Sequence, residues 1–89
     1  MFMALSAGSL TAGEIETVRE ANDIYESGQH KKALQVYDEY LRRYPDSVVV
    51  NFNVGVMLFQ KKDYDSAVKY LTRTLVTDDK QIERGALNY

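Results

Sequence analysis

The sequence contains no cysteine and no tryptophan, one histidine and one proline. Without cysteine, the chain has no disulfide, no thiolate nucleophile and no cysteine-ligated zinc. Its net charge is −2, from 11 basic and 13 acidic residues without a basic block, so it lacks the positive patch that nucleic-acid binding needs. We expect no nucleic-acid partner. The absence of cysteine fits the cytoplasm, while a periplasmic or membrane-tethered location stays open.

Long apolar runs are also missing. The N-terminal stretch MFMALSAGSL is about half as long as a membrane span and lacks the positive start of a signal peptide. We expect no membrane span and interpret residues 1–10 as a disordered lead-in or a remnant of expression. The alternative is the end of a processed apolar segment. Residues 11–89 are then one domain, because the chain is too short for two.

The two halves of the chain are similar at an offset of 34 residues, with 14–47 aligned on 48–81. Identities are few, and Ala33 with Ala67 is one of them. The apolar positions agree in kind, whereas the polar positions between them do not. We interpret the halves as two copies of one structural unit, followed by a partial third unit at 82–89.

Within each unit, apolar residues recur every three or four positions, which is the period of a helix. Thr11 and Glu14 match a capping box before the first helix, and Gly28 is suited to end it. Pro45 stops the second helix. The pattern predicts an all-α fold of antiparallel helix-turn-helix units with short connections, made of four helices and a partial fifth helix at 82–89.

The segment VVVNFNVGVMLFQ, residues 48–60, alternates in part between apolar and polar residues, as a strand does. Its length and the helical period of its neighbours favour a helix instead. A helix that is apolar on nearly every side needs partners on several sides, as an inner element of a repeat array has.

This pattern resembles the tetratricopeptide repeat, a helix-turn-helix unit of 34 residues. Residues of the two units that stand on the family's signature positions are Ala21, Ile24, Gly28, Ala33, Tyr37 and Pro45, then Gly55, Leu58, Tyr64, Ala67 and Leu71. The stretch KKDYDSAVKYL is similar to the family's turn and second helix. Lys62 replaces the turn glycine, and Asp79 replaces the closing proline. The resemblance implies an α-α superhelix of stacked helix pairs.

Residues for catalysis are scarce. His30 is the one histidine, and its position favours a packing or turn role over that of a general base. The chain has no glycine-rich phosphate loop and no nucleophile–base motif. Asp78 and Asp79 have no third ligand at metal spacing. We therefore expect no enzyme, no metal and no cofactor.

The family resemblance implies a scaffold or adaptor that binds a protein or peptide partner in a concave groove. The side chains expected to line this groove are Ile15, Val18, Asn22, Tyr25, Glu26, Val49, Phe52, Asn53, Val56, Phe59 and Gln60. Two alternatives stay open. One is a carboxylate clamp of the co-chaperone type, for which Asn22 and Asn53 are suitably placed, although Val18 stands where such clamps need a lysine. The other is a repeat that self-assembles through its groove or its uncapped end, or that is a fragment of a longer array.

Overall fold

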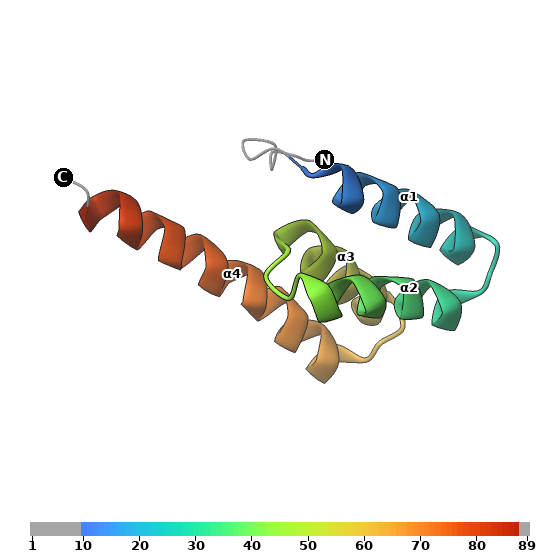
Figure 1. Ribbon diagram of the computed structural model, residues 1–89. Coiled ribbons are helices and arrows are strands. Elements are labelled where there is room, and N and C mark those ends of the chain that lie inside the picture. The colour runs from blue at the N-terminus through green and yellow to red at the C-terminus, as the bar shows by residue number, and fades with distance from the viewer. Residues whose placement is uncertain (1–9, 88–89) are drawn as a thin grey trace.

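The computed structural model describes the backbone of residues 10–87 and the side chains of residues 10–75. This part of the chain forms four helices and no strand. They are α1 (Ala12–Glu26), α2 (His30–Arg43), α3 (Val48–Gln60) and α4 (Tyr64–Leu87). Helix α1 pairs mainly with α2, and α3 with α4 (Figure 1). The expected all-α fold is confirmed, and residues 1–9 of the expected lead-in lie outside the described part.

The starts of α1 and α3 are fixed by side-chain caps. Thr11 Oγ1 accepts a hydrogen bond from the Glu14 backbone N–H at 3.0 Å, and Glu14 Oε1 accepts one from the Thr11 backbone N–H at 3.0 Å. This is the capping box that the sequence predicts. At α3, Ser47 Oγ accepts from the Val50 backbone N–H at 3.3 Å. Both caps satisfy backbone donors that have no partner inside the helix.

The turns inside the two helix pairs have the same hydrogen bonds, 34 residues apart. In the first turn, the Gly28 N–H donates to the Tyr25 carbonyl and the Gln29 N–H to the Ile24 carbonyl. In the second, the Lys62 N–H donates to Phe59 and the Asp63 N–H to Leu58. Gly28 and Lys62 both have positive φ, 94° and 68°. This left-handed conformation at a helix end favours glycine, and Lys62 adopts it although it has a side chain.

The core lies between the helix pairs and is made mostly of small and medium side chains. Its members are Ala21, Ala33, Tyr37, Leu41, Val50, Val54 and Met57. Gly55 of α3 marks the closest approach of α4, because a Cβ built there would lie 2.6 Å from Cγ and Cδ2 of Leu71. The small residue at this position therefore permits tight packing, as the family resemblance implies.

A buried amide organises the corner between α2 and α3. Asn51 is 1% exposed, and its Nδ2 donates to the carbonyl oxygens of Pro45 at 3.0 Å and Ser47 at 2.9 Å. Its Oδ1 accepts from Nη1 of Arg73 in α4 at 3.4 Å. The side chain thus pairs two corner carbonyls and connects the corner to α4.

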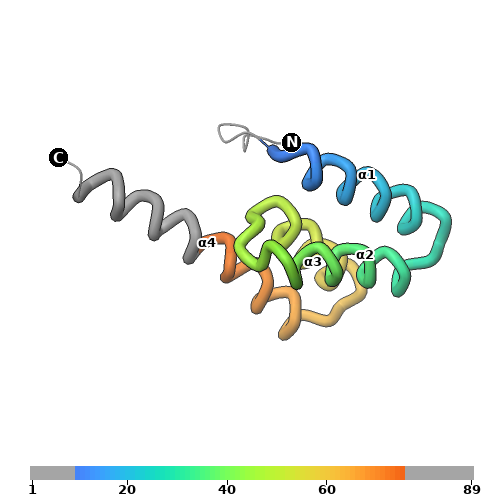
Figure 2. Tube along the Cα trace, in the orientation of Figure 1, coloured from blue at the N-terminus to red at the C-terminus, as the bar shows by residue number. Residues whose placement is uncertain are grey.

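The stretch Val48–Gln60 is a single helix, which confirms the helical interpretation of this apolar segment. The expected division of the C-terminal region into a fourth helix and a partial fifth helix at 82–89 is not confirmed. Helix α4, whose first turns are coloured in Figure 2, continues from Tyr64 to Leu87 without a turn near Asp79 (Figure 1), so a separate fifth helix does not begin at 82. The reason is local. Helix α2 ends before Pro45, whereas the equivalent position in α4 is Asp79, which does not interrupt a helix as proline does.

Candidate functional site

Helices α1 and α3 are connected by hydrogen bonds near both of their ends. Near their starts, Ser47 Oγ donates to Glu14 Oε2 at 2.6 Å. At their far ends, the Tyr25 hydroxyl donates to Gln60 Oε1 at 2.8 Å. The two helices therefore run in the same direction, each contributing one face to the space between them.

An open hollow with a volume of about 380 Å³ lies along this space. It is lined by Leu10, Ile15, Val18, Arg19, Asn22, Asp23 and Val49. The α1 residues of this set recur every three or four positions and share one helix face. Ile15 is 43% exposed, while Val18 and Val49 are half-buried.

Four of the residues expected to line a groove meet in this hollow, namely Ile15, Val18, Asn22 and Val49. Leu10, Arg19 and Asp23 also line it and were not expected there. Arg19 and Asp23 each follow an expected groove residue by one position, so the width of the α1 face was underestimated. Leu10 falls in the stretch interpreted as a lead-in.

The remaining expected groove residues lie outside the hollow. Phe52 is 50% exposed and Phe59 is 58% exposed. The Phe59 ring packs edge-on against Tyr64 of α4, with 5.2 Å between ring centroids. Glu26 and Gln60 are exposed, and Val56 is half-buried. The outer half of the expected groove is thus an exposed surface of α3.

The two asparagines that suggest a carboxylate clamp are in different situations. Asn22 is exposed at the edge of the hollow. Asn53 is half-buried, and its Nδ2 donates to the Val49 carbonyl within α3 at 2.8 Å. One amide donor of Asn53 is therefore already used by its own helix. Together with the apolar Val18, this weakens the clamp hypothesis, which stays a prediction.

Two other side chains with ionisable groups, His30 and Tyr37, are partly or fully buried. His30 stacks on the Tyr25 ring with 4.0 Å between centroids, so it packs at the start of α2. Tyr37 is fully buried, and its hydroxyl has no hydrogen-bond partner among the described residues. Burial raises the pKa of Tyr37 from 10.0 to about 12, because the charged form is desolvated. Neither group lines the hollow.

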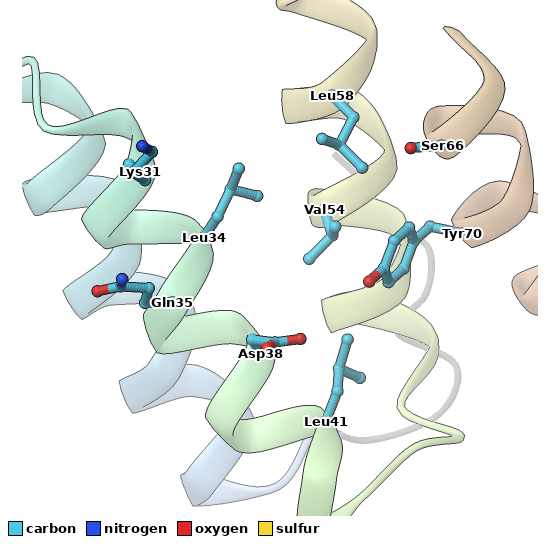
Figure 3. A pocket seen from close by; sticks show the side chains of 9 residues that line it. All are labelled: Lys31, Leu34, Gln35, Asp38, Leu41, Val54, Leu58, Ser66 and Tyr70. Atoms are coloured by element: carbon cyan, nitrogen blue, oxygen red, sulfur yellow. The ribbon is translucent and has the colours of Figure 1, made fainter. Parts of the chain in front are cut away.

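A second hollow, of about 290 Å³, lies between α2, α3 and α4. Leu34 of α2, Val54 of α3 and Tyr70 of α4 point into it from different sides (Figure 3). Sequence reasoning did not find this hollow, because the same apolar residues are equally suited to a core. Contact between α2 and α4 is slight at most, whereas α2 packs mainly on α1 and α4 on α3, so a space remains between the facing sides of α2 and α4.

Side chains suited to metal binding do not gather in the described part of the chain. Within it, no group of three histidine, aspartate or glutamate side chains is placed to hold an ion. The helices described there also lack the combined length and apolar character that crossing a bilayer requires.

Two antiparallel helix pairs whose turns have the same backbone hydrogen bonds define the class of the protein, an all-α helical repeat protein. Residues 18–47, which cover most of α1, all of α2 and the following corner, match the family model of the tetratricopeptide repeat. This match, over about a third of the chain, supports a protein of the tetratricopeptide repeat family. No curated protein and no solved structure gives a significant match. Repeats of this family generally mediate protein–protein interactions and are generally not enzymes.

Proposed function

We propose that this protein is an adaptor that binds an extended segment of a partner protein in the hollow between α1 and α3. One observation carries the proposal: Ile15, Val18 and Val49 stay accessible between two helices that are joined near both ends. A preformed apolar hollow of this volume is within the range of natural ligand sites, about 300–1,000 Å³.

The side chains of the hollow suit a partner segment that has apolar side chains and backbone groups available for hydrogen bonding. Ile15, Val18 and Val49 supply apolar contact, and the exposed amide of Asn22 is available to the backbone of an extended chain. Full burial of such a side chain contributes about 1.5–3 kcal/mol. Association costs about 4 kcal/mol or more, so three such side chains leave a net of at most about 5 kcal/mol, and we expect apolar contact alone to give sub-millimolar affinity at best.

The test uses a peptide probe selected on the protein from a phage-displayed library of linear peptides. The selected peptide is synthesised and titrated against the wild type, Val49→Asp and Val68→Asp. Val49 lines the hollow, whereas Val68 is 61% exposed on α4 outside it. Both variants exchange the same residue types, so general effects of charge cancel. We expect Val49→Asp to weaken binding about ten-fold or more, and Val68→Asp to leave it unchanged.

Circular dichroism checks that both variants keep the helical content of the wild type. Because Val49 also packs against the core, Ile15→Asp repeats the test at a more exposed position of the hollow. Equal binding by the wild type, Val49→Asp and Ile15→Asp would reject the proposal. A double variant, Phe52→Asp with Phe59→Asp, tests whether the outer surface of α3 contributes.

Self-association is a second candidate function, which one exposed surface favours. Phe59 of α3 and Tyr64, Val68 and Leu75 of α4 are all more than half exposed, from 51% to 63%. Such a group of large apolar side chains is typical of an interaction surface. A second copy of the chain would cover it.

Sedimentation equilibrium over a wide concentration range tests this candidate with the same two variants. Self-association through α4 requires a mass that rises with concentration in the wild type and in Val49→Asp, but not in Val68→Asp. A wild type that stays monomeric throughout the range would remove the candidate. The two variants thus distinguish the hollow from the α4 surface.

A further inference from the structure

The hollow between α1 and α3 lies beside the point where the described chain begins. Leu10, the first described residue, is one of its lining side chains and is 42% exposed. Nine residues, MFMALSAGS, precede Leu10 in the sequence. The polypeptide therefore enters the described structure at the mouth of the hollow.

The composition of this preceding stretch fits the surface of the hollow. Residues 1–9 have no charged side chain and contain three large apolar side chains within four positions, Phe2, Met3 and Leu5. The hollow presents Ile15, Val18 and Val49, which the described residues leave accessible. The remainder of α1 is strongly acidic, with Glu16 and Glu20 exposed, and offers nothing to an uncharged apolar stretch.

The apolar part of the stretch is long enough to follow most of the hollow. Because residues 6–9 take up the reversal of direction, the five residues before them extend over about 17 Å. Helix α1 has 15 residues and is about 22 Å long, and the hollow follows it from Leu10 to Asp23. Ser6, Gly8 and Ser9 separate the apolar part from Leu10, and glycine permits the reversal of direction that a return along α1 requires.

We propose that residues 1–9 bind in the hollow of their own chain and compete there with the partner segment. The shared site rests on the proposed function, but docking of the segment itself requires no partner. A short tether holds a segment at an effective concentration in the millimolar range. An intrinsically weak contact is therefore populated within one chain, and the partner meets a site that is already partly filled.

The absence of cysteine allows a direct test in the full chain. Ala4→Cys provides a single attachment point for a nitroxide spin label, and ¹⁵N spectra report which amides the label approaches. We expect loss of the Val18, Asn22 and Val49 amide signals, with Lys32 on α2 unaffected. The matched control carries the same label together with Phe2→Asp and Leu5→Asp. The tether is then identical, but the apolar contact is removed, so the three signals should return.

Two results would overturn the proposal. The first is equal signal loss with and without the two aspartates, which would show random contact by a tethered label. The second is full signal loss in a mixture of labelled ¹⁴N chain and unlabelled ¹⁵N chain, which would place the segment on a second copy.

Competition is measured separately with the selected peptide. If the segment fills the hollow in half to nine-tenths of molecules, Phe2→Asp with Leu5→Asp raises the apparent affinity about two- to ten-fold. Unchanged affinity would contradict competition. Failure of the label experiment leaves the partner site standing, and failure of Val49→Asp to weaken peptide binding leaves the docked segment standing.

Discussion

Leu41 and Leu75 are identical residues 34 positions apart, yet Leu41 is 7% exposed and Leu75 is 63% exposed. The same contrast holds for Tyr37, which is fully buried, and its counterpart Leu71, which is half-buried. The first helix pair is covered by the second, whereas no described residue covers the corresponding side of the second pair. Equivalent sequence positions thus have equivalent local structure but different neighbours.

The positions that depend only on contacts within one pair do match. Ala33 and Ala67 are 0% and 1% exposed, and the two turns have the same hydrogen bonds. Burial at these positions is a property of the helix pair itself. Burial at positions 41 and 75 is a property of the stack. Mutations at paired positions separate the two contributions.

The largest contrast is expected for truncation of the two leucines. Leu41→Ala removes a buried side chain and leaves a cavity, which costs about 2–4 kcal/mol of unfolding free energy. Leu75→Ala removes an exposed side chain and changes stability by less than about 0.5 kcal/mol. Urea denaturation at low protein concentration measures both. Similar losses would show that Leu75 is covered in solution, for example by a second copy.

The next effect concerns the close approach of α4 to α3. Gly55→Ala places a Cβ 2.6 Å from Leu71, and overpacking of this kind costs about 1–3 kcal/mol. Alanine regains about 1 kcal/mol of helix propensity, so we expect a net loss of up to about 2 kcal/mol. Ala21, the counterpart in α1, already has this methyl group.

Thermal denaturation of Gly55→Ala, Leu71→Ala and the double variant checks the cause. If the clash is responsible, the double variant loses less stability than the two single changes added together. A gain in stability for Gly55→Ala alone would show that Leu71 moves aside without cost.

A smaller gain is expected at Tyr37. Its buried hydroxyl has no partner among the described residues, so Tyr37→Phe removes an unsatisfied polar group and stabilises the fold by about 1 kcal/mol. Phenylalanine keeps the ring and its packing. Urea denaturation at pH 7 measures the gain, and a loss of stability would show that the hydroxyl is hydrogen-bonded.

The same variant predicts a difference in pH dependence. Because burial raises the pKa of Tyr37 from 10.0 to about 12, the folded state favours the neutral hydroxyl. This contribution is complete below pH 10 and is lost as the pH rises from 10 to 12. The wild type should therefore lose more stability than Tyr37→Phe in that window. Parallel curves would contradict a buried, protonated Tyr37.

The smallest effects are expected at the paired turns. Lys62→Gly relieves a left-handed conformation that disfavours a side chain, and should stabilise by about 0.5–1 kcal/mol after the entropy of the unfolded chain is included. Gly28→Lys should destabilise by a similar amount. Thermal melts of the two reciprocal variants measure the same exchange in opposite directions. Effects of equal sign would show that the turns are not equivalent.

Much of the fold is predictable because it depends on local chemistry. The capping box at Thr11, the helix end at Gly28 and the stop before Pro45 each act within a few residues, and the structure has all three. The continuation of α4 past Asp79 was not predicted, because the family pattern places a turn there. In this chain the proline that would enforce the turn is missing, and the helix continues.

The candidate site is predictable only in part, because it depends on how the pairs stack. Helical period and family resemblance identify the α1 face that carries Ile15 and Val18. They do not show how far α3 turns its other residues away, and Phe52 and Phe59 lie outside the hollow. They also assign Leu10 to a lead-in, since one residue ahead of the cap carries no periodic signal.

The hydrogen bond from Tyr25 to Gln60 limits how far α1 and α3 can separate around the hollow. It joins the C-terminal ends of α1 and α3 and lies at the solvent-exposed surface. Because water competes there, this single hydrogen bond contributes only about 0.5–1.5 kcal/mol. When this bond is broken, the hydrogen bond between Ser47 and Glu14 still joins the starts of the two helices. The hydrogen bond at this end is therefore the weaker of the two connections between α1 and α3, since the bond between Glu14 and Ser47 is partly buried.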